Sequence, residues 1–257
     1  MDAQGIADHI VEWLGTYLDQ SGLEGFVVGV SGGIDSAVTS TLCALTGKPV
    51  TAVTMPIHQA SNQVSLADEH LAWLDGKFEN VQTRKIALTP VFEAIQQHLP
   101  SDVQDDLTMA NTRSRLRMVT LYACAGSSKR LVAGTGNKVE DFGVGFYTKY
   151  GDGGVDLSPI ADLMKSEVYA VAAALGVIEG IQNAAPTDGL FDDGRTDEGQ
   201  IGASYDELEW AMAFDGDEAA ISNREREVLA IYRRFHAANK HKMLPIPVCE
   251  IPAQLRD

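Results

Sequence analysis

The feature of this chain that most constrains its fold is a regular alternation of short apolar runs and longer segments with helical spacing. The apolar runs lie at residues 25–30, 50–55, 81–88 and 130–134. Continuous apolar runs of this length are typical of strands buried on both faces of a parallel sheet. Right-handed crossovers place the connecting helices on both faces of such a sheet. The sequence therefore predicts an α/β fold, a Rossmann-like doubly wound parallel sheet with a helical C-terminal part.

Helical periodicity and the lack of a linker predict how the whole chain is organised. Beyond residue 156 the pattern is helical, apart from a polar loop at residues 186–202. No stretch is rich enough in Pro, Gly or Ser to divide the chain. We therefore expect a single domain, with an N-terminal helix (1–24), an α/β core (about 25–180) and a C-terminal loop with helices (about 181–257). The earlier helical segments are residues 6–18, 35–45, 61–75, 89–98 and 107–125.

Composition disfavours two classes of partner. The chain has 36 acidic and 20 basic residues, a net charge of −16, so no nucleic-acid partner is expected. The longest uncharged apolar stretch, near residues 169–178, is too short for a bilayer, so no membrane partner is expected either.

Cys43, Cys124 and Cys249 form no metal or disulfide pattern, which favours a cytoplasmic protein. Most histidines lack metal-ligand spacing and are expected to be surface or structural groups: His9, His58, His70, His98 and His236.

The sharpest motif stands where the first apolar run meets the next helix. Glycines there let the backbone turn tightly and expose N–H groups, Ser31 and Ser36 add hydroxyl donors, and the helix directs its positive end to the same point. The segment therefore predicts an anion site, and Asp35 fits beside a phosphate if Mg²⁺ lies between them. The alternative is a turn in which Asp35 and Ser36 cap the helix. The residues of this loop are Gly29, Val30, Ser31, Gly32, Gly33, Ile34, Asp35 and Ser36.

The loop resembles the pyrophosphate loop of the N-type ATP pyrophosphatases, which have an adenine nucleotide alpha hydrolase-like fold and activate substrates by adenylation. A second string, Thr-Lys-Tyr-Gly-Asp-Gly-Gly at residues 148–154, follows Gly-Thr-Gly-Asn-Lys at residues 134–138. Taken alone, these glycine-rich strings could be a solvated surface loop. Together with the first loop they resemble the NAD synthetases, and further matches extend over roughly residues 25–247.

The resemblance implies a role for individual residues. The loop from Gly29 to Ser36 would bind ATP. The ligands of Mg²⁺ would be Asp35 and Glu140. Further ATP contacts would come from Thr135, Lys165 and Thr187. The deamidated dinucleotide substrate would be contacted by Arg115, Lys149, Asp156, His241 and Lys242. The family also implies a homodimer whose substrate site borders the interface.

The reaction that the resemblance implies is the amidation of deamido-NAD (nicotinic acid adenine dinucleotide) to NAD. ATP would convert the nicotinate carboxylate into an adenylate with release of pyrophosphate, and ammonia would then displace AMP. Such chemistry depends on positioning and charge neutralisation, so no protein nucleophile is required. About 24 residues precede the first predicted strand, too few for the catalytic-Cys domain of a glutamine-using synthetase. We therefore expect free ammonia as the nitrogen source, unless a separate glutaminase subunit delivers it.

Two other functions stay open on the sequence alone. One is another adenylating enzyme of the same group, such as a GMP synthetase ATP module or a tRNA-thiolating enzyme, although the latter should be basic and carry a reactive Cys. The other is a non-catalytic nucleotide-binding module that keeps the fold without turnover. The presence of Asp35, Glu140, Lys149 and Lys165 favours an enzyme over such a module.

Overall fold

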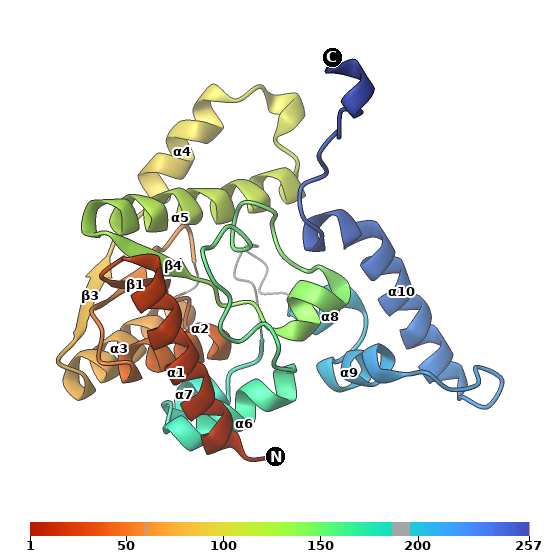
Figure 1. Cartoon of the computed structure of the whole chain (residues 1–257), viewed down its shortest axis with the longest axis horizontal. Helices are drawn as coiled ribbons and strands as arrows, with labels where there is room; N and C mark the ends of the chain where they lie inside the picture. Colours follow the sequence, from red (N-terminus) through yellow and green to blue (C-terminus); the bar gives the residue numbers. More distant parts are fainter. Residues whose placement is uncertain (60, 187–195, 257) are drawn as a thin grey trace.

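A parallel sheet of four strands lies at the centre of the structure, a computed structural model that describes residues 1–59, 61–186 and 196–256 (Figure 1). The strand order is β3-β2-β1-β4, and all neighbouring strands are parallel. Beyond β4, Leu157 forms a further parallel bridge to Ala133. The strands are β1 (Gly25–Gly29), β2 (Val50–Thr54), β3 (Val81–Lys85) and β4 (Arg130–Ala133).

The strand order places a crevice between β1 and β4. From β1 the chain crosses to β2 and β3 on one side, and β4 then lies on the other side of β1. Val28 of β1 pairs with Ala52 and with Ala133, so the carboxyl ends of these strands are nearly level. Open α/β sheets bind ligands at such a reversal, outside the carboxyl ends of the strands. The loops that follow β1 and β4 therefore open into one crevice.

Helices cover both faces of the sheet, as the sequence predicts. α1, α2, α3 and α6 pack on one face, and α4 and α5 pack on the other. Within the described ranges, no helix combines the length and the apolarity needed to cross a bilayer. The helices are α1 (Ala3–Ser21), α2 (Ile34–Leu45), α3 (Ser61–Lys77), α4 (Thr89–His98), α5 (Asp106–Ser128), α6 (Lys165–Leu175), α7 (Glu179–Gln182), α8 (Asp197–Ile201), α9 (Tyr205–Ala213) and α10 (Asn223–Met243). Short 3₁₀ turns are η1 (Ser101–Val103) and η3 (Ala253–Leu255), and a π-helix is η2 (Val139–Val144).

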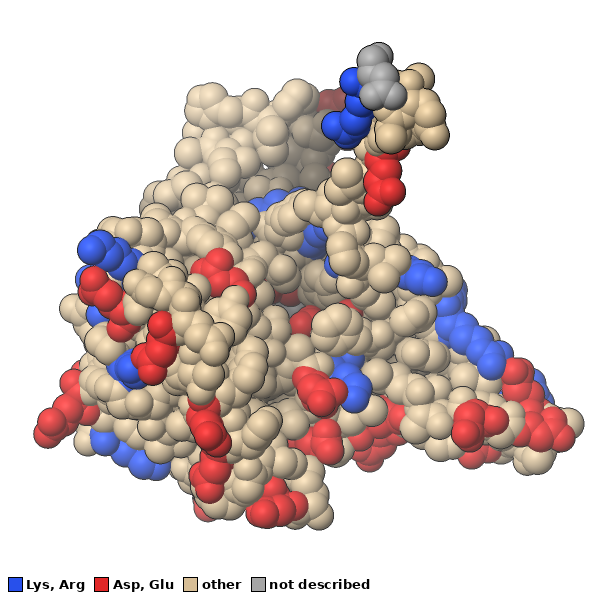
Figure 2. All heavy atoms as spheres, viewed as in Figure 1, with Lys and Arg blue, Asp and Glu red and all other residues tan. Residues whose placement is uncertain are grey.

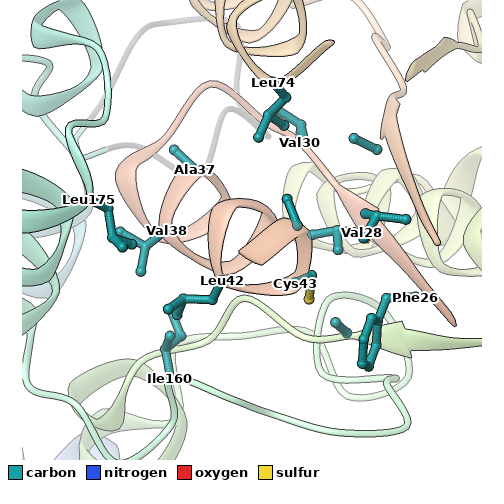
Figure 3. Packing of buried hydrophobic residues seen from close by; sticks show 14 of the residues in the cluster. Phe26, Val28, Val30, Ala37, Val38, Leu42, Cys43, Leu74, Ile160 and Leu175 are labelled. Carbon is teal, nitrogen blue, oxygen red and sulfur yellow. The ribbon is translucent and has the colours of Figure 1, made fainter. Parts of the chain in front are cut away.

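Alternate residues of β1 belong to the cores on opposite faces of the sheet. Phe26 and Val28 lie in the cluster with Leu42 of α2, which Figure 3 shows from close by. Val27, between them, lies in the second cluster with Phe92 of α4. All five side chains are completely buried. Because β1 is held by packing on both faces, the loop that follows it starts from a rigid position.

One predicted strand is shorter in the structure. The sequence predicts a strand over residues 81–88, whereas β3 ends at Lys85. Leu88 still donates its N–H to the carbonyl oxygen of Pro56, but proline has no N–H with which to continue the ladder. Because Pro56 follows β2, the ladder between β2 and β3 stops there and the edge strand β3 ends early.

The C-terminal helices form a third cluster against the π-helix η2. Val139 and Val144 of η2 are buried together with Tyr205 and Leu208 of α9 and with Leu229 of α10. α9 also contacts α6. This packing fixes η2, which follows β4, beside the crevice of the sheet.

Candidate active site

The loop between β1 and α2 forms a turn suited to an anion. Gly32 has a φ of 90°, in the left-handed region that favours glycine. The Ser36 hydroxyl donates to the carbonyl oxygen of Gly33 at 2.9 Å and accepts from the backbone N–H of Ser31 at 3.2 Å. α2 begins at Ile34, and N–H groups in the first turn of a helix have no partner inside that helix. The turn therefore offers backbone N–H groups and the positive end of a helix to one point.

A cavity of about 520 Å³ lies at the crevice between β1 and β4. Its volume is within the usual range for small-molecule sites. The whole loop from Gly29 to Ser36 lines it, together with Thr135, Glu140 and Lys165. Thr187 is the one predicted ATP contact that lies outside the described residues. Apolar side chains complete the lining, among them Met55, Leu66, Met118, Leu121 and Val155.

A buried lysine links the charged groups of the cavity. Lys165, the first residue of α6, is only 3% exposed. Its ammonium donates to Asp35 Oδ2 at 2.5 Å and to Glu140 Oε1 at 3.1 Å. The two carboxylate side chains are themselves 16% and 17% exposed. One cation is therefore shared by two largely buried anions, which come from α2 and η2.

Burial and charge act in opposite directions on this lysine. Burial lowers the pKa of the Lys165 ammonium, but the Asp35 and Glu140 carboxylates outweigh burial and raise that pKa above its usual value. Burial also raises the pKa of the nearby Asp141 carboxyl to about 8, and the negative charge of Glu140 adds to this effect. Among the residues that the structure describes, Asp35 and Glu140 thus present two carboxylates to the single ammonium of Lys165, an arrangement that favours a bound cation.

The donor set fits a magnesium ion. Proteins usually hold Mg²⁺ with one or two carboxylates, and substrate phosphates and waters complete the octahedron. Asp35 and Glu140 supply two carboxylates in the same cavity as the anion turn. Among the described residues, no three His, Cys, Asp or Glu side chains are grouped as a metal site. Two carboxylates beside a phosphate turn are suited to a metal ion that is shared with a nucleotide.

Two residues to which the sequence analysis assigned no role complete the charged cluster. Asn137 donates its amide N–H to Asp35 Oδ1 at 3.0 Å, and its carbonyl oxygen accepts from the backbone N–H of Glu140 at 3.1 Å. Tyr205 donates its hydroxyl to Glu140 Oε1 at 2.6 Å. Asn137 lies within the string at residues 134–138, which could have indicated it. Tyr205 begins α9, and the sequence analysis used no motif there.

Four of the five predicted substrate residues lie together near the end of α10. The Lys149 ammonium donates to the carbonyl oxygen of His241 at 2.8 Å. The Arg115 guanidinium donates to the carbonyl oxygen of Lys149 at 3.4 Å. Lys242 follows His241 directly, at the same end of the helix. Four basic residues therefore gather at one place in a strongly acidic chain.

Two of the predicted substrate residues, Lys242 and Asp156, also make hydrogen bonds within the protein. Lys242 donates to the carbonyl oxygens of Gly145 and Tyr147 at 2.8 and 2.7 Å, and burial lowers the pKa of its ammonium. Asp156 accepts from a backbone N–H of β4 at 2.8 Å and from the Tyr122 hydroxyl at 3.0 Å. In the part of the chain that the structure describes, the five predicted substrate residues are not in the lining of the cavity. Their contact with substrate stays a prediction.

The string at residues 148–154 joins the cavity to this basic group. Asp152 accepts from the Ser114 hydroxyl at 2.6 Å and from the backbone N–H of Thr148 at 3.1 Å. Asp152 and Ser114 both line the cavity. The next residue of α5 is Arg115, which belongs to the basic group. The glycine-rich string thus contributes Gly151, Asp152 and Gly154 to the lining of the cavity, while Tyr150 is exposed.

Comparisons with known proteins identify relatives over the full length of the chain. The model of the family described as NAD synthase matches residues 6–243. An NH(3)-dependent NAD(+) synthetase from Syntrophomonas wolfei is 37% identical over 100% of both chains. Another from Methanosarcina acetivorans is 39% identical over 80% of this chain and 79% of that protein.

Two solved structures of similar proteins have the same fold as this chain. The NMN synthetase from Francisella tularensis has a TM-score of 0.86 at 31% identity, over 98% of this chain and 99% of that one. The NH3-dependent NAD synthetase from Campylobacter jejuni, in complex with the nitrate ion, has a TM-score of 0.79 at 26% identity, over 97% and 100%.

Proposed function

The chain belongs to the NAD synthase family, and we propose that it catalyses the ATP-dependent amidation of deamido-NAD to NAD with free ammonia. The products besides NAD are AMP and pyrophosphate, so the enzyme is a ligase that forms a C–N bond. The observation that carries this proposal is Lys165, which lies between Asp35 and Glu140 beside the anion turn. A phosphate turn, a buried cation and two carboxylates are groups that position ATP and neutralise its charge, on which such chemistry depends.

The first half of the reaction activates the carboxylate. An oxygen of the nicotinate carboxylate attacks the α-phosphorus of ATP, and the bond from that phosphorus to pyrophosphate breaks. The N–H group of Gly32 and the N-terminus of α2 take the phosphate chain. Lys165 offsets the negative charge that develops on the departing pyrophosphate. Thr135, which lines the same cavity, and Thr187 are proposed as further ATP contacts.

We assign Mg²⁺ to Asp35 and Glu140. When bound, the ion supplies positive charge to the phosphate oxygens and orients them for displacement. Asn137 supports this assignment, because its side chain holds Asp35 and also accepts from the backbone of Glu140. One short side chain thereby sets the position of both proposed ligands.

The second half of the reaction forms the amide. The nitrogen of ammonia attacks the carbonyl carbon of the adenylate, the bond from that carbon to the AMP oxygen breaks, and the nitrogen loses a proton. An adenylate is also attacked by water, so the cavity must exclude it. The apolar side chains of Met118, Leu121 and Val155 line the cavity and serve this purpose.

The dinucleotide substrate is anionic, and we assign its binding to Arg115, Lys149, Asp156, His241 and Lys242. The gathering of basic groups near the end of α10 supports this assignment, because the chain as a whole has a net charge of −16. Figure 2 shows Lys and Arg side chains following α10 on a face where acidic side chains are widespread. A local basic group attracts an anionic ligand that the overall charge would repel.

We also propose that the protein acts in the cytoplasm as a homodimer and binds no nucleic acid. The unpaired Cys43, Cys124 and Cys249 suit a reducing compartment. Leu107 and Val119 on α5 are exposed apolar side chains that a second copy could cover. The net charge of −16 opposes binding to a polyanion.

A product assay tests the proposed function. Purified protein with ATP, Mg²⁺, ammonium and deamido-NAD should yield NAD, AMP and pyrophosphate in equal amounts. Amidation of xanthylate instead would indicate a GMP synthetase-like enzyme. Tight ATP binding without any amidation would indicate a nucleotide-binding module.

The similarity to the NMN synthetase favours one second candidate, a ligase that makes NMN from its deamidated mononucleotide. The two candidates share the ATP site and differ only in the substrate. Parallel assays with the dinucleotide and the mononucleotide at equal concentrations separate them, because the proposed function requires the larger kcat/KM for the dinucleotide.

A further inference from the structure

Tyr205 contacts both Glu140 and Lys165, although it belongs to the C-terminal helices and not to the α/β core. Its side chain is only 5% exposed, and it lies at the start of α9 within the C-terminal cluster. Its hydroxyl donates to Glu140 Oε1 at 2.6 Å. The Lys165 ammonium lies 4.7 Å from the centre of its ring. A cation over an aromatic face is attracted by the ring, more strongly where water is excluded.

Both side-chain hydrogen bonds of Glu140 are made by the same carboxylate oxygen, Oε1. The ammonium of Lys165 and the hydroxyl of Tyr205 both bind Oε1. Within the described part of the chain, Oε2 makes no hydrogen bond, and Glu140 lines the cavity. Two donors on one oxygen fix the carboxylate plane and leave the other oxygen for a ligand in the cavity.

Tyr205 is itself held firmly. Its backbone N–H donates to the Glu198 side chain of α8 at 2.9 Å, and the preceding Ser204 caps α9 with Glu207 in a capping box. The hydroxyl also lies 3.4 Å from Asp197 Oδ2. A phenol is protonated at neutral pH, so the hydroxyl acts as the donor to the Glu140 carboxylate.

We propose that Tyr205 is a positioning residue, whose hydroxyl orients the Glu140 carboxylate toward Mg²⁺ and whose ring holds the Lys165 ammonium beside Asp35. The proposal rests on the proposed function in that it takes ATP with Mg²⁺ as the ligand of the cavity. A tyrosine with a merely structural role would support packing with its ring, and its hydroxyl would have no effect on a metal-dependent step.

The test compares Tyr205→Phe with the parent protein by calorimetric titration of ATP, with Mg²⁺ and in its absence. The loss of one hydrogen bond predicts an ATP affinity that is about 3-fold to 10-fold weaker with Mg²⁺. Without Mg²⁺ the affinity should stay within about twofold, because phenylalanine keeps the ring over Lys165. Tyr232→Phe is the matched control, since Tyr232 belongs to the same cluster and does not line the cavity. It should change neither titration.

A double-mutant cycle with Glu140→Gln makes the test sharper. If Tyr205 acts through Glu140, adding Tyr205→Phe to Glu140→Gln should have no further effect on binding with Mg²⁺. Equal weakening with and without Mg²⁺, or no weakening at all, would overturn the proposal. So would a Tyr205→Phe protein that fails to fold, because the hydroxyl would then be a structural group. The titrations require no turnover, so their result is independent of whether NAD is formed.

Discussion

Replacing Lys165 with methionine removes the one cation that Asp35 and Glu140 share and keeps most of the side-chain volume. Coulomb's law at an effective dielectric constant of about 20 gives about 7 and about 5 kcal/mol for N···O distances of 2.5 and 3.1 Å. Desolvation of the buried ammonium offsets several kcal/mol of this attraction. We therefore expect Lys165→Met to lower the free energy of unfolding by about 3–5 kcal/mol at pH 7, as breaking a buried ion pair does.

The pH dependence of this loss has a definite sign. Burial raises the pKa of the Asp35 carboxyl in the folded protein even beside the ammonium, and removing that positive charge raises it further. Groups with a raised folded-state pKa stabilise the protein at low pH and lose that contribution as the pH rises. The loss in free energy of unfolding caused by Lys165→Met should therefore become smaller as the pH falls from 7 toward 5. Turnover should fall by a factor of about 10² or more at either pH, because the charge on pyrophosphate is no longer offset.

Urea denaturation followed by circular dichroism measures the stability of both proteins across this pH range. Lys138→Met is the control, because Lys138 makes a surface ion pair with Asp162 at 2.8 Å in which the aspartate is 96% exposed. Such pairs contribute about 0–1 kcal/mol. If Lys165→Met were no less stable than the control, the account of a buried, shared cation would be refuted.

Three further predictions concern His70, Gly32 and Asp35. Burial lowers the pKa of His70 from 6.5 to about 4, so below pH 6.5 the unfolded chain binds a proton that the folded chain does not. Between pH 7 and pH 5 this group should cost about 2 kcal/mol of stability, and His70→Gln should abolish that part of the pH dependence in urea melts. Gly32→Ala places a side chain at a φ of 90° and should weaken ATP binding about tenfold in calorimetry, since the strain costs about 1–2 kcal/mol. Asp35→Ala should eliminate NAD formation while circular dichroism shows an unchanged fold, and retained turnover would remove Asp35 from the metal site.

The sequence predicts the sheet and the phosphate loop because both depend on local patterns. The apolar run at residues 25–30 contains β1, and the glycine pair after it indicates the turn before α2. Periodicity also predicts α1, where Ile10, Leu14 and Leu18 form the buried face. The prediction that His70 is a structural group is confirmed, because it is buried and bonded to Ser40 at 2.9 Å.

The contacts that assemble the site could not be predicted in the same way. Lys165 reaches Asp35 across 130 positions of the chain, and Tyr205 reaches Glu140 across 65. No local pattern encodes such pairs, because they depend on how η2, α6 and α9 pack together. The family resemblance indicates Asp35, Glu140 and Lys165 as site residues, and only the structure shows that one ammonium binds both carboxylates.

The most direct test of the account follows the oxygen atoms of the substrate carboxylate. If that carboxylate attacks the α-phosphorus of ATP, deamido-NAD labelled with a heavy isotope in both carboxylate oxygens must transfer one labelled oxygen to AMP. Mass spectrometry of the products should then show AMP with one label and pyrophosphate with none. Unlabelled AMP, or label in inorganic phosphate, would contradict adenylation of the substrate carboxylate.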